Sequence, residues 1–260
     1  MNPNSRASAQ LGTHSGMEHT RRITAACRPS CLPIEEGYRR WAPIYDSTPN
    51  PILALEERYL MPLLPSVRGK SILDLACGTG RWLQILVNMG PRLGVGIDLS
   101  TAMLAVAQRK ASLGGILAKA DCTRLPFRGQ CFDLVVFSFA LGHVADIGRM
   151  IKELARVMKP NADLYVSDIH PEAYDNGWRT GFRDETSAAE IEQSPRSLTS
   201  IRERFASAGF SSVQMLPCVF GKPEGPIFDR AGKGERFESL RQVPAIYVCH
   251  FKLNAKPTRI

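Results

Sequence analysis

The chain has 260 residues, of which 44% are hydrophobic and 22% charged. That length suits one large α/β domain with a well-buried core and is too short for two ordinary enzyme domains with a linker. The formal net charge is +8, but the excess is scattered, so we expect a solvated basic surface and no nucleic-acid partner. No apolar run approaches the length of a membrane span.

The cysteines point to a reducing setting. Their number, seven, is odd, and their spacing is not that of a small disulfide-rich domain. We therefore expect a cytoplasmic protein. Cys27 and Cys31 form a lone pair without a second pair or a His partner at zinc-like spacing, so we expect no metal site.

The first 33 residues are polar, poor in acids and without hydrophobic periodicity. We expect a disordered tail over residues 1–33, although an organelle transit peptide also fits this composition. One domain is then expected over residues 34–260. Its first part, residues 34–66, should hold short helices at Glu35–Arg40 and Ile52–Met61, because prolines punctuate the segment.

From Ser71 onward, strand and helix patterns alternate, which favours a parallel sheet with helices on both faces. Apolar strands such as Leu134–Phe137 fit burial on both faces of such a sheet. The predicted strands cover residues 71–75, 93–97, 115–119, 132–137, 162–168, 211–219 and 246–253, and the predicted helices cover residues 80–89, 101–111, 146–158 and 197–208.

Two polar stretches, residues 171–195 and 220–244, interrupt this alternation. Long excursions beside the strand ends of an α/β sheet often serve as lids or binding loops, so we expect both on the substrate side, with plain surface loops as the alternative. The first excursion contains Tyr174, Trp178 and Phe182, which could wall a planar or apolar substrate or belong to the core.

A loop of small residues, Ala76-Cys-Gly-Thr-Gly80, lies between a predicted strand and a predicted helix. Small residues let the backbone approach a ligand closely, and the helix start offers free amide groups. Gly78 and Gly80 are present, but position 83 is Leu, so the third glycine of a dinucleotide-binding fingerprint is missing. Asp74, just before the loop, would repel a pyrophosphate and suits a ligand that carries an ammonium and a sulfonium.

Acidic residues end the next two strands. Asp98 follows Gly78 by about 20 residues, where a carboxylate accepts hydrogen bonds from both ribose hydroxyls. Asp98 could instead cap the next helix, but Ser100 is the better cap. Asp121, after the third strand, could accept a hydrogen bond from an adenine amino group. Together these positions predict S-adenosylmethionine as the ligand.

The chain resembles the class I S-adenosylmethionine-dependent methyltransferases, in particular the ubiquinone/menaquinone C-methyltransferase group. The resemblance covers Ser71 to about Ile169 and is weaker outside that range. It is carried by the glycine loop, Gly94–Ser100, Asp121 with Leu125–Phe127, Phe132–Val136, Glu153–Pro160 and Val166–Asp168. It implies a Rossmann-like, seven-stranded, mostly parallel sheet with an antiparallel last strand and helices on both faces.

The resemblance also implies a set of cofactor contacts. The backbone of Ala76, Gly78 and Gly80 is expected to hold the methionine part, with Asp74 near its amino group through water. Asp98 is expected to bind the ribose. The other expected contacts are Leu99 and Met103 beside the adenine, Asp121 and Cys122 at its edge, Ser138 and Phe139 at the sulfonium, and Tyr38 and Tyr45 in the N-terminal segment that closes over the cofactor.

Methyl transfer needs mainly alignment, and it needs a general base only where the acceptor starts protonated. His143 follows the fourth strand and His170 the fifth, so both are expected at the carboxyl edge of the sheet, where ligands bind. Asp168 could orient His170 or face the substrate alone. His143 could instead serve packing or cofactor contact.

We expect a methyltransferase that acts on an O, N or C nucleophile of a small-molecule substrate. Ser138-Phe-Ala-Leu141 stands where exocyclic amine methyltransferases carry an Asn/Asp-Pro-Pro-Tyr/Phe tetrad, which argues against nucleobase amino groups. The basic charge keeps an RNA methyltransferase as an alternative. A non-catalytic binding or scaffold protein is another, and the intact cofactor positions count against it. The sequence indicates no oligomeric state.

Overall fold

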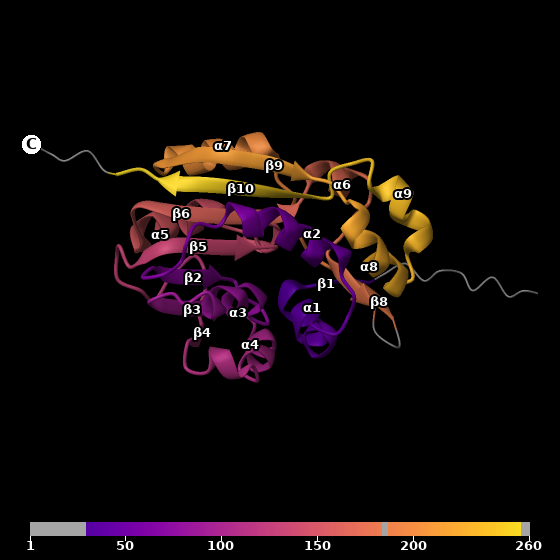
Figure 1. The fold of residues 1–260 in the computed structure, drawn as a ribbon, viewed down its shortest axis with the longest axis horizontal. Coiled ribbons are helices and arrows are strands. Elements are labelled where there is room, and N and C mark those ends of the chain that lie inside the picture. The colour runs from indigo at the N-terminus through magenta and orange to yellow at the C-terminus, as the bar shows by residue number, and fades with distance from the viewer. Residues whose placement is uncertain (1–29, 184–186, 256–260) are drawn as a thin grey trace, which may run out of the picture.

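The computed structural model describes residues 30–183 and 187–255. A seven-stranded sheet with the order β4-β3-β2-β5-β6-β10-β9 forms its centre, and helices cover it (Figure 1). Only β10 runs antiparallel to its neighbours, while the other pairs are parallel. The predicted seven-stranded, mostly parallel sheet with an antiparallel last strand is therefore confirmed.

The bounds of the main elements follow the predicted ones closely. The strands of the large sheet are β2 (Ser71–Leu75), β3 (Leu93–Asp98), β4 (Leu117–Lys119), β5 (Phe132–Ser138), β6 (Met158–Ile169), β9 (Phe210–Cys218) and β10 (Ile246–Leu253). The helices around it are α1 (Ile34–Trp41), α2 (Pro51–Leu60), α3 (Arg81–Asn88), α4 (Thr101–Ala107), α5 (Ile147–Val157) and α7 (Leu198–Ser207).

Two elements begin or end two or more residues inside their predicted bounds, and the backbone gives the reason. Gly115 has a φ of +78°, outside the strand region, so β4 begins only at Leu117. Lys110 has an extended backbone, so α4 ends at Ala107 and a separate 3-10 turn follows. Helix starts are set by side chains: Ser100 accepts a hydrogen bond from the Met103 N–H, as expected of a cap.

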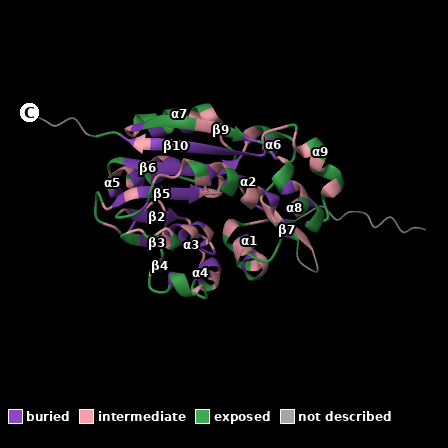
Figure 2. Ribbon diagram, viewed as in Figure 1, coloured by how far each residue is buried: buried purple, intermediate pink, exposed green. Residues whose placement is uncertain are grey.

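The core lies on both faces of the large sheet. Alternate residues of β5 point to opposite sides, with Val135 and Phe137 in the cluster that includes α5 and α7, and with Leu134 and Val136 in the cluster that includes α2 and α3. The central strands are almost entirely buried (Figure 2). Burial on both faces is what the continuous apolar run predicts.

A second, smaller sheet has the order β1-β8-β7 and lies beside α1. It joins β1 (Ser30–Leu32) in parallel to β8 (Ala188–Ile191), while β7 (Gly181–Arg183) is antiparallel to β8. The predicted disordered tail is therefore wrong at its last residues, because pairing with a distant strand orders residues 30–32. Residues 1–29 of that tail lie outside the described residues.

Short helices fill the two excursions. The first contains α6 (Pro171–Asp175), and the second contains α8 (Gly225–Arg230) and α9 (Phe237–Leu240). Phe228 of α8 is buried in the cluster that contains α2. The ion pair between Arg58 of α2 and the buried Glu224, at 2.7 Å, ties the same region together. Residues 220–244 thus pack against α2.

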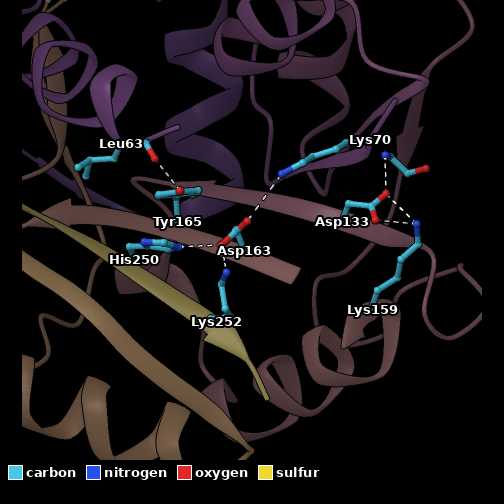
Figure 3. A network of polar contacts seen from close by, with 9 residues as sticks. Leu63, Lys70, Asp133, Lys159, Asp163, Tyr165, His250 and Lys252 are labelled. Carbon is cyan, nitrogen blue, oxygen red and sulfur yellow. Dashed lines mark hydrogen bonds and ion pairs between the residues drawn. The ribbon is translucent and has the colours of Figure 1, made fainter. Parts of the chain in front are cut away.

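Charged residues hold the amino edge of the parallel strands together (Figure 3). Asp163 of β6, which lies opposite Leu134 near the start of β5, pairs with His250 at 3.0 Å, Lys252 at 3.4 Å and Lys70 at 3.8 Å. Asp133 of β5 pairs with Lys159 at 2.7 Å and accepts a hydrogen bond from the Ser71 N–H. No helix in the described part of the chain is long and apolar enough to cross a membrane.

Candidate functional site

A cavity of about 300 Å³ opens at the other edge of the large sheet, where β2, β3 and β5 end. Its wall is completed by the glycine loop, the start of α4, residues 120–122, the segment after β5 and one side of α1. Carboxyl ends of parallel strands are the usual ligand-binding edge of open α/β sheets. Strand order alone thus brings together residues that lie far apart in the sequence.

Nearly all the predicted cofactor-binding residues line this one cavity, and Gly80 alone among them does not. The lining includes Tyr38, Tyr45, Asp74, Ala76, Gly78, Asp98, Leu99, Met103, Asp121, Cys122, Ser138 and Phe139. Gly80 has a φ of +76° where α3 begins, and a Cβ there would collide with Leu113. The backbone conformation and the close packing against Leu113 thus explain why a glycine stands at position 80.

The glycine loop is shaped by left-handed backbone conformations. Ala76 has a φ of +54° and Gly78 a φ of +55°. A side chain added at Gly78 would meet no atom within 4 Å, so this backbone faces open space. The Gly78 N–H donates to Asp98 Oδ2 at 2.7 Å, which holds the loop against the end of β3. The loop can therefore bring its backbone close to a ligand.

The missing third glycine has a structural counterpart on β3. Leu83 occupies that position on α3, and its side chain is fully buried. A Cβ on Gly96 would lie 2.8 Å from Leu83 Cδ2, and one on Gly94 would lie 2.9 Å from Val87 Cγ2. The close approach of helix and strand that a third glycine permits is here achieved by glycines of the strand.

Asp98 is held in place by backbone groups. Its Oδ1 accepts from the Ser100 N–H at 2.7 Å, while its Oδ2 accepts from Gly78. Burial raises the pKa of Asp98, and the Ser100 and Gly78 N–H groups oppose that rise. The carboxylate keeps further acceptor capacity, since each oxygen can take more than one hydrogen bond.

Asp74 is buried at the end of β2, with only 2% of its surface exposed. Its Oδ2 accepts from the Leu83 N–H at 2.8 Å, which ties the strand to α3. Burial raises the pKa of Asp74 to about 7, against the lowering effects of the Leu83 N–H and the Arg81 charge. A cation placed beside this carboxyl would favour its ionised form.

Arg81 also lines the cavity, and the sequence did not single it out. Its Nη2 donates to Glu56 of α2, a fully buried carboxylate that also accepts from Trp82 Nε1 at 2.9 Å and from Ser167 Oγ. Arg81 Nη1 is buried with no hydrogen-bond acceptor among the described residues, and its ion pair with Glu57 spans 4.0 Å. A ligand carboxylate would supply that acceptor, so this donor set fits the methionine part of the predicted cofactor.

The segment after α1 is tied to the glycine loop. Asp46 accepts from Thr79 Oγ1 at 2.6 Å and pairs with Lys110 at 2.8 Å. Tyr45 packs against Trp41 with ring centroids 4.7 Å apart, and burial raises the pKa of Tyr45 to about 12. The ion pair between Asp46 and Lys110 could not be predicted from a sequence pattern, because it joins segments that are distant in the chain.

The structure brings only one of the three predicted catalytic residues to the cavity. His143 lines it, with Nε2 2.9 Å from the Tyr38 hydroxyl and Nδ1 2.7 Å from the Glu192 carbonyl oxygen. His170 caps α6, accepts from the Glu172 N–H, and is not part of the lining. Asp168 is buried and accepts from the Gly142 and Ile169 N–H groups beside a second, very small cavity.

Neither excursion lines the main cavity with a described residue. Phe182 stacks on Trp41 at 5.6 Å, and Trp178 stacks on Phe220 at 5.8 Å. These two aromatic residues therefore pack within the protein, in agreement with the core alternative. The first excursion contacts the site indirectly, through the Glu192 carbonyl that holds His143.

Comparison with known proteins agrees with this geometry. Residues 73–166 match the family described as "Methyltransferase domain". A demethylmenaquinone methyltransferase from Thermus thermophilus is 39% identical over 39% of this chain and 48% of the relative. One from Listeria welshimeri is 26% identical over 70% of this chain and 89% of the relative. In the matches with the relatives from Lactiplantibacillus plantarum and Thermus thermophilus, this chain spans about half of the relative's length.

Among solved structures, an S-adenosylmethionine-dependent methyltransferase from Mesorhizobium loti has a TM-score of 0.63 at 20% identity, covering 78% of this chain and 100% of that chain. At this identity the similarity shows the fold. The sheet order is that of the Rossmann-like methyltransferase fold, residues 73–166 match a methyltransferase domain, and the sequence is similar to demethylmenaquinone methyltransferases.

Proposed function

We propose that this chain transfers a methyl group from S-adenosylmethionine to a small-molecule acceptor of the quinone type. The observation that carries the proposal is the cavity of about 300 Å³ at the carboxyl edge of the sheet, lined by Asp74, Asp98 and the glycine loop. The acceptor class is supported by the names of the relatives, which are demethylmenaquinone methyltransferases. A cytoplasmic location stays a prediction from the cysteines.

The cofactor is proposed to lie across the glycine loop. Asp98 would accept from the ribose hydroxyls, while Asp121 and Cys122 would meet the adenine edge. Asp74 and Arg81 would face the amino and carboxylate groups of the methionine part, because one is an acceptor and the other a cation with a free donor. The S-adenosylmethionine sulfonium supplies an already activated methyl group, so the chain's main task is alignment.

The same contacts favour an enzyme over a non-catalytic scaffold. His143 and Tyr38 line the cavity, so polar groups capable of proton transfer stand beside the cofactor positions. The scattered charge of +8 is the only feature behind the RNA methyltransferase alternative, and no contact of the site adds to it.

The test uses the full chain. Isothermal titration with S-adenosylmethionine should show saturable binding, and absence of binding would overturn the proposal. Transfer of a radiolabelled methyl group should then be measured with 1,4-naphthalenediol, a reduced naphthoquinone without a ring methyl, and with a short RNA. Label that enters only the RNA would favour the alternative and contradict a quinone-type acceptor.

A further inference from the structure

We propose that Tyr38 and His143 form a proton relay that takes the hydroxyl proton from a phenol- or enol-type acceptor. This inference rests on the proposed function and deepens it, because it names a class of acceptor that must lose a proton. Tyr38 comes from α1 and His143 from the segment after β5, and both side chains line the main cavity. The hydroxyl of Tyr38 lies 2.9 Å from His143 Nε2.

The hydrogen bonds on His143 determine its neutral tautomer. Nδ1 lies 2.7 Å from the Glu192 carbonyl oxygen, which can only accept, so Nδ1 carries the proton. In the neutral ring Nε2 is then an acceptor, and the Tyr38 hydroxyl must donate to it. Burial raises the pKa of Tyr38 well above its ordinary value, which keeps that hydroxyl protonated and able to donate. The pair is thus poised to pass a proton from Tyr38 to His143.

Packing holds the two rings in this arrangement. They meet edge to face with centroids 5.4 Å apart, and Tyr38 stacks on Trp41 at 6.0 Å. Three acidic or weakly acidic groups act on Tyr38 from other segments: Tyr45, Asp168 of β6 and Asp98 of β3. Glu35 of α1 also lines the cavity. Asp168 Oδ2 accepts from the N–H of Gly142, the residue before His143, at 2.8 Å, which fixes the backbone beside the histidine.

The proton step balances within the site. The acceptor O–H bond breaks and its proton goes to the Tyr38 oxygen, while the Tyr38 proton goes to His143 Nε2. The electron pair left on the acceptor oxygen, directly or through a conjugated ring carbon, forms the bond to the methyl carbon. The carbon–sulfur bond breaks, and its electron pair stays on sulfur. A positioned base of this kind contributes about 10²–10⁴-fold in rate.

The experiment compares Tyr38→Phe, His143→Gln and the double variant as full chains. Tyr174→Phe and His170→Gln are the matched controls, since neither residue lines the cavity. Methyl transfer is measured over a pH series from pH 7 upward, with 1,4-naphthalenediol and with a ring-halogenated 1,4-naphthalenediol, whose hydroxyl is the stronger acid. Titration of each variant with S-adenosylmethionine serves as the independent measure of an intact site.

With the weaker acid, each single variant should lose about 10²–10⁴-fold in kcat, and the double variant should lose no more than the worse single one. The loss should shrink with the stronger acid and as the pH rises toward the acceptor's own pKa, while cofactor affinity changes less than about tenfold. Equal losses with both acceptors at every pH, or full activity of Tyr38→Phe, would overturn the relay alone. An unaltered chain that transfers no methyl to either diol would overturn the proposed function, and the relay with it.

Discussion

The two edges of the large sheet treat their buried carboxylates in opposite ways. At the amino edge, Asp163 is surrounded by His250, Lys252 and Lys70 (Figure 3), and these partners outweigh the effect of burial and lower its pKa. At the cavity edge, burial prevails and raises the pKa of Asp74 and of Asp98. The amino edge is electrostatically complete, whereas the cavity edge has room for a cation from outside the chain.

The cations of the two edges likewise differ in how fully they are paired. Lys159 has both oxygens of Asp133 within 2.7 Å. Arg81 is paired on one side with Glu56 and has a buried Nη1 without a hydrogen-bond acceptor in the described part of the chain. An amino acid zwitterion would complete both deficits of the cavity edge at once. Unsatisfied charge, and not charge itself, therefore marks the ligand edge of this sheet.

The largest expected effect comes from removing the Glu56 charge. Glu56→Gln leaves Arg81 without its main partner in a buried position, which typically costs about 3–5 kcal/mol. We expect a loss of this order in the free energy of unfolding, measured by urea denaturation. Glu57→Gln, whose partner distance is 4.0 Å and whose side chain is 52% exposed, is the control and should change little. Similar losses of stability in both variants would contradict the role of Glu56 as the main partner of Arg81.

Asp98→Ala should have the next largest effect, on binding. It removes the acceptor of the Gly78 and Ser100 N–H groups and the proposed ribose acceptor together. Each hydrogen bond to a charged group is worth about 1.5–3 kcal/mol, so we expect affinity for S-adenosylmethionine to fall by roughly 10- to 100-fold. Titration calorimetry measures this, and unchanged affinity would show that the ribose lies elsewhere.

At the amino edge, Asp163→Asn should reduce stability by about 1–2 kcal/mol, because Lys70, Lys252 and His250 lose the carboxylate that they share. Cofactor affinity should stay the same. Because the folded pKa is lowered, the contribution of Asp163 is fully present above its unfolded value of about 3.9 and is lost as the pH falls through the folded value. A change in affinity equal to that of Asp98→Ala would erase the distinction between the edges.

Asp74 should make cofactor binding depend on pH. Its folded pKa of about 7 exceeds the unfolded value, so ionisation destabilises the free chain as the pH rises from about 4 to 7. A bound ammonium favours the ionised form, so affinity should rise by at most about tenfold per pH unit below pH 7 and level off above it. Calorimetry in buffers of different ionisation enthalpy should detect proton release near pH 7, and Asp74→Asn should abolish it.

His170→Ala should have the smallest effect. The side chain caps α6, a loss that costs about 1 kcal/mol or less, and it is absent from the cavity lining. Turnover with 1,4-naphthalenediol should stay within about twofold of the unaltered chain. A much larger fall in kcat would return His170 to the list of catalytic candidates.

The sequence predicted the parts of the fold that repeat a local pattern. The strand Ile246–Leu253 was predicted to the residue, and Ser100 was recognised as a cap because both rest on neighbouring residues. The glycine loop and Asp98 were found by spacing. Local pattern could also place His170 at the correct edge, but it could not tell that the ring turns back to cap its own helix.

What the sequence missed depends on contacts between distant segments. The strand β1 exists because Ser30–Leu32 pairs with residues 189–191. Glu56 sits in an ordinary helical pattern, and its burial emerges only when Arg81, Trp82 and Ser167 converge on it. The role of Gly96 opposite Leu83 is likewise a property of the packed pair, because neither residue alone indicates it.

The contact between α1 and β8 bears on how the site opens. A Cβ on Gly37 would lie 2.6 Å from Ile191 Cγ1, and β1, which leads into α1, is hydrogen-bonded to the same strand. Helix and small sheet should therefore move as one rigid body. Exchange of a bound cofactor is then expected to follow the slow displacement of that whole body, on the timescale of domain motion, rather than the rapid fraying of a single helix.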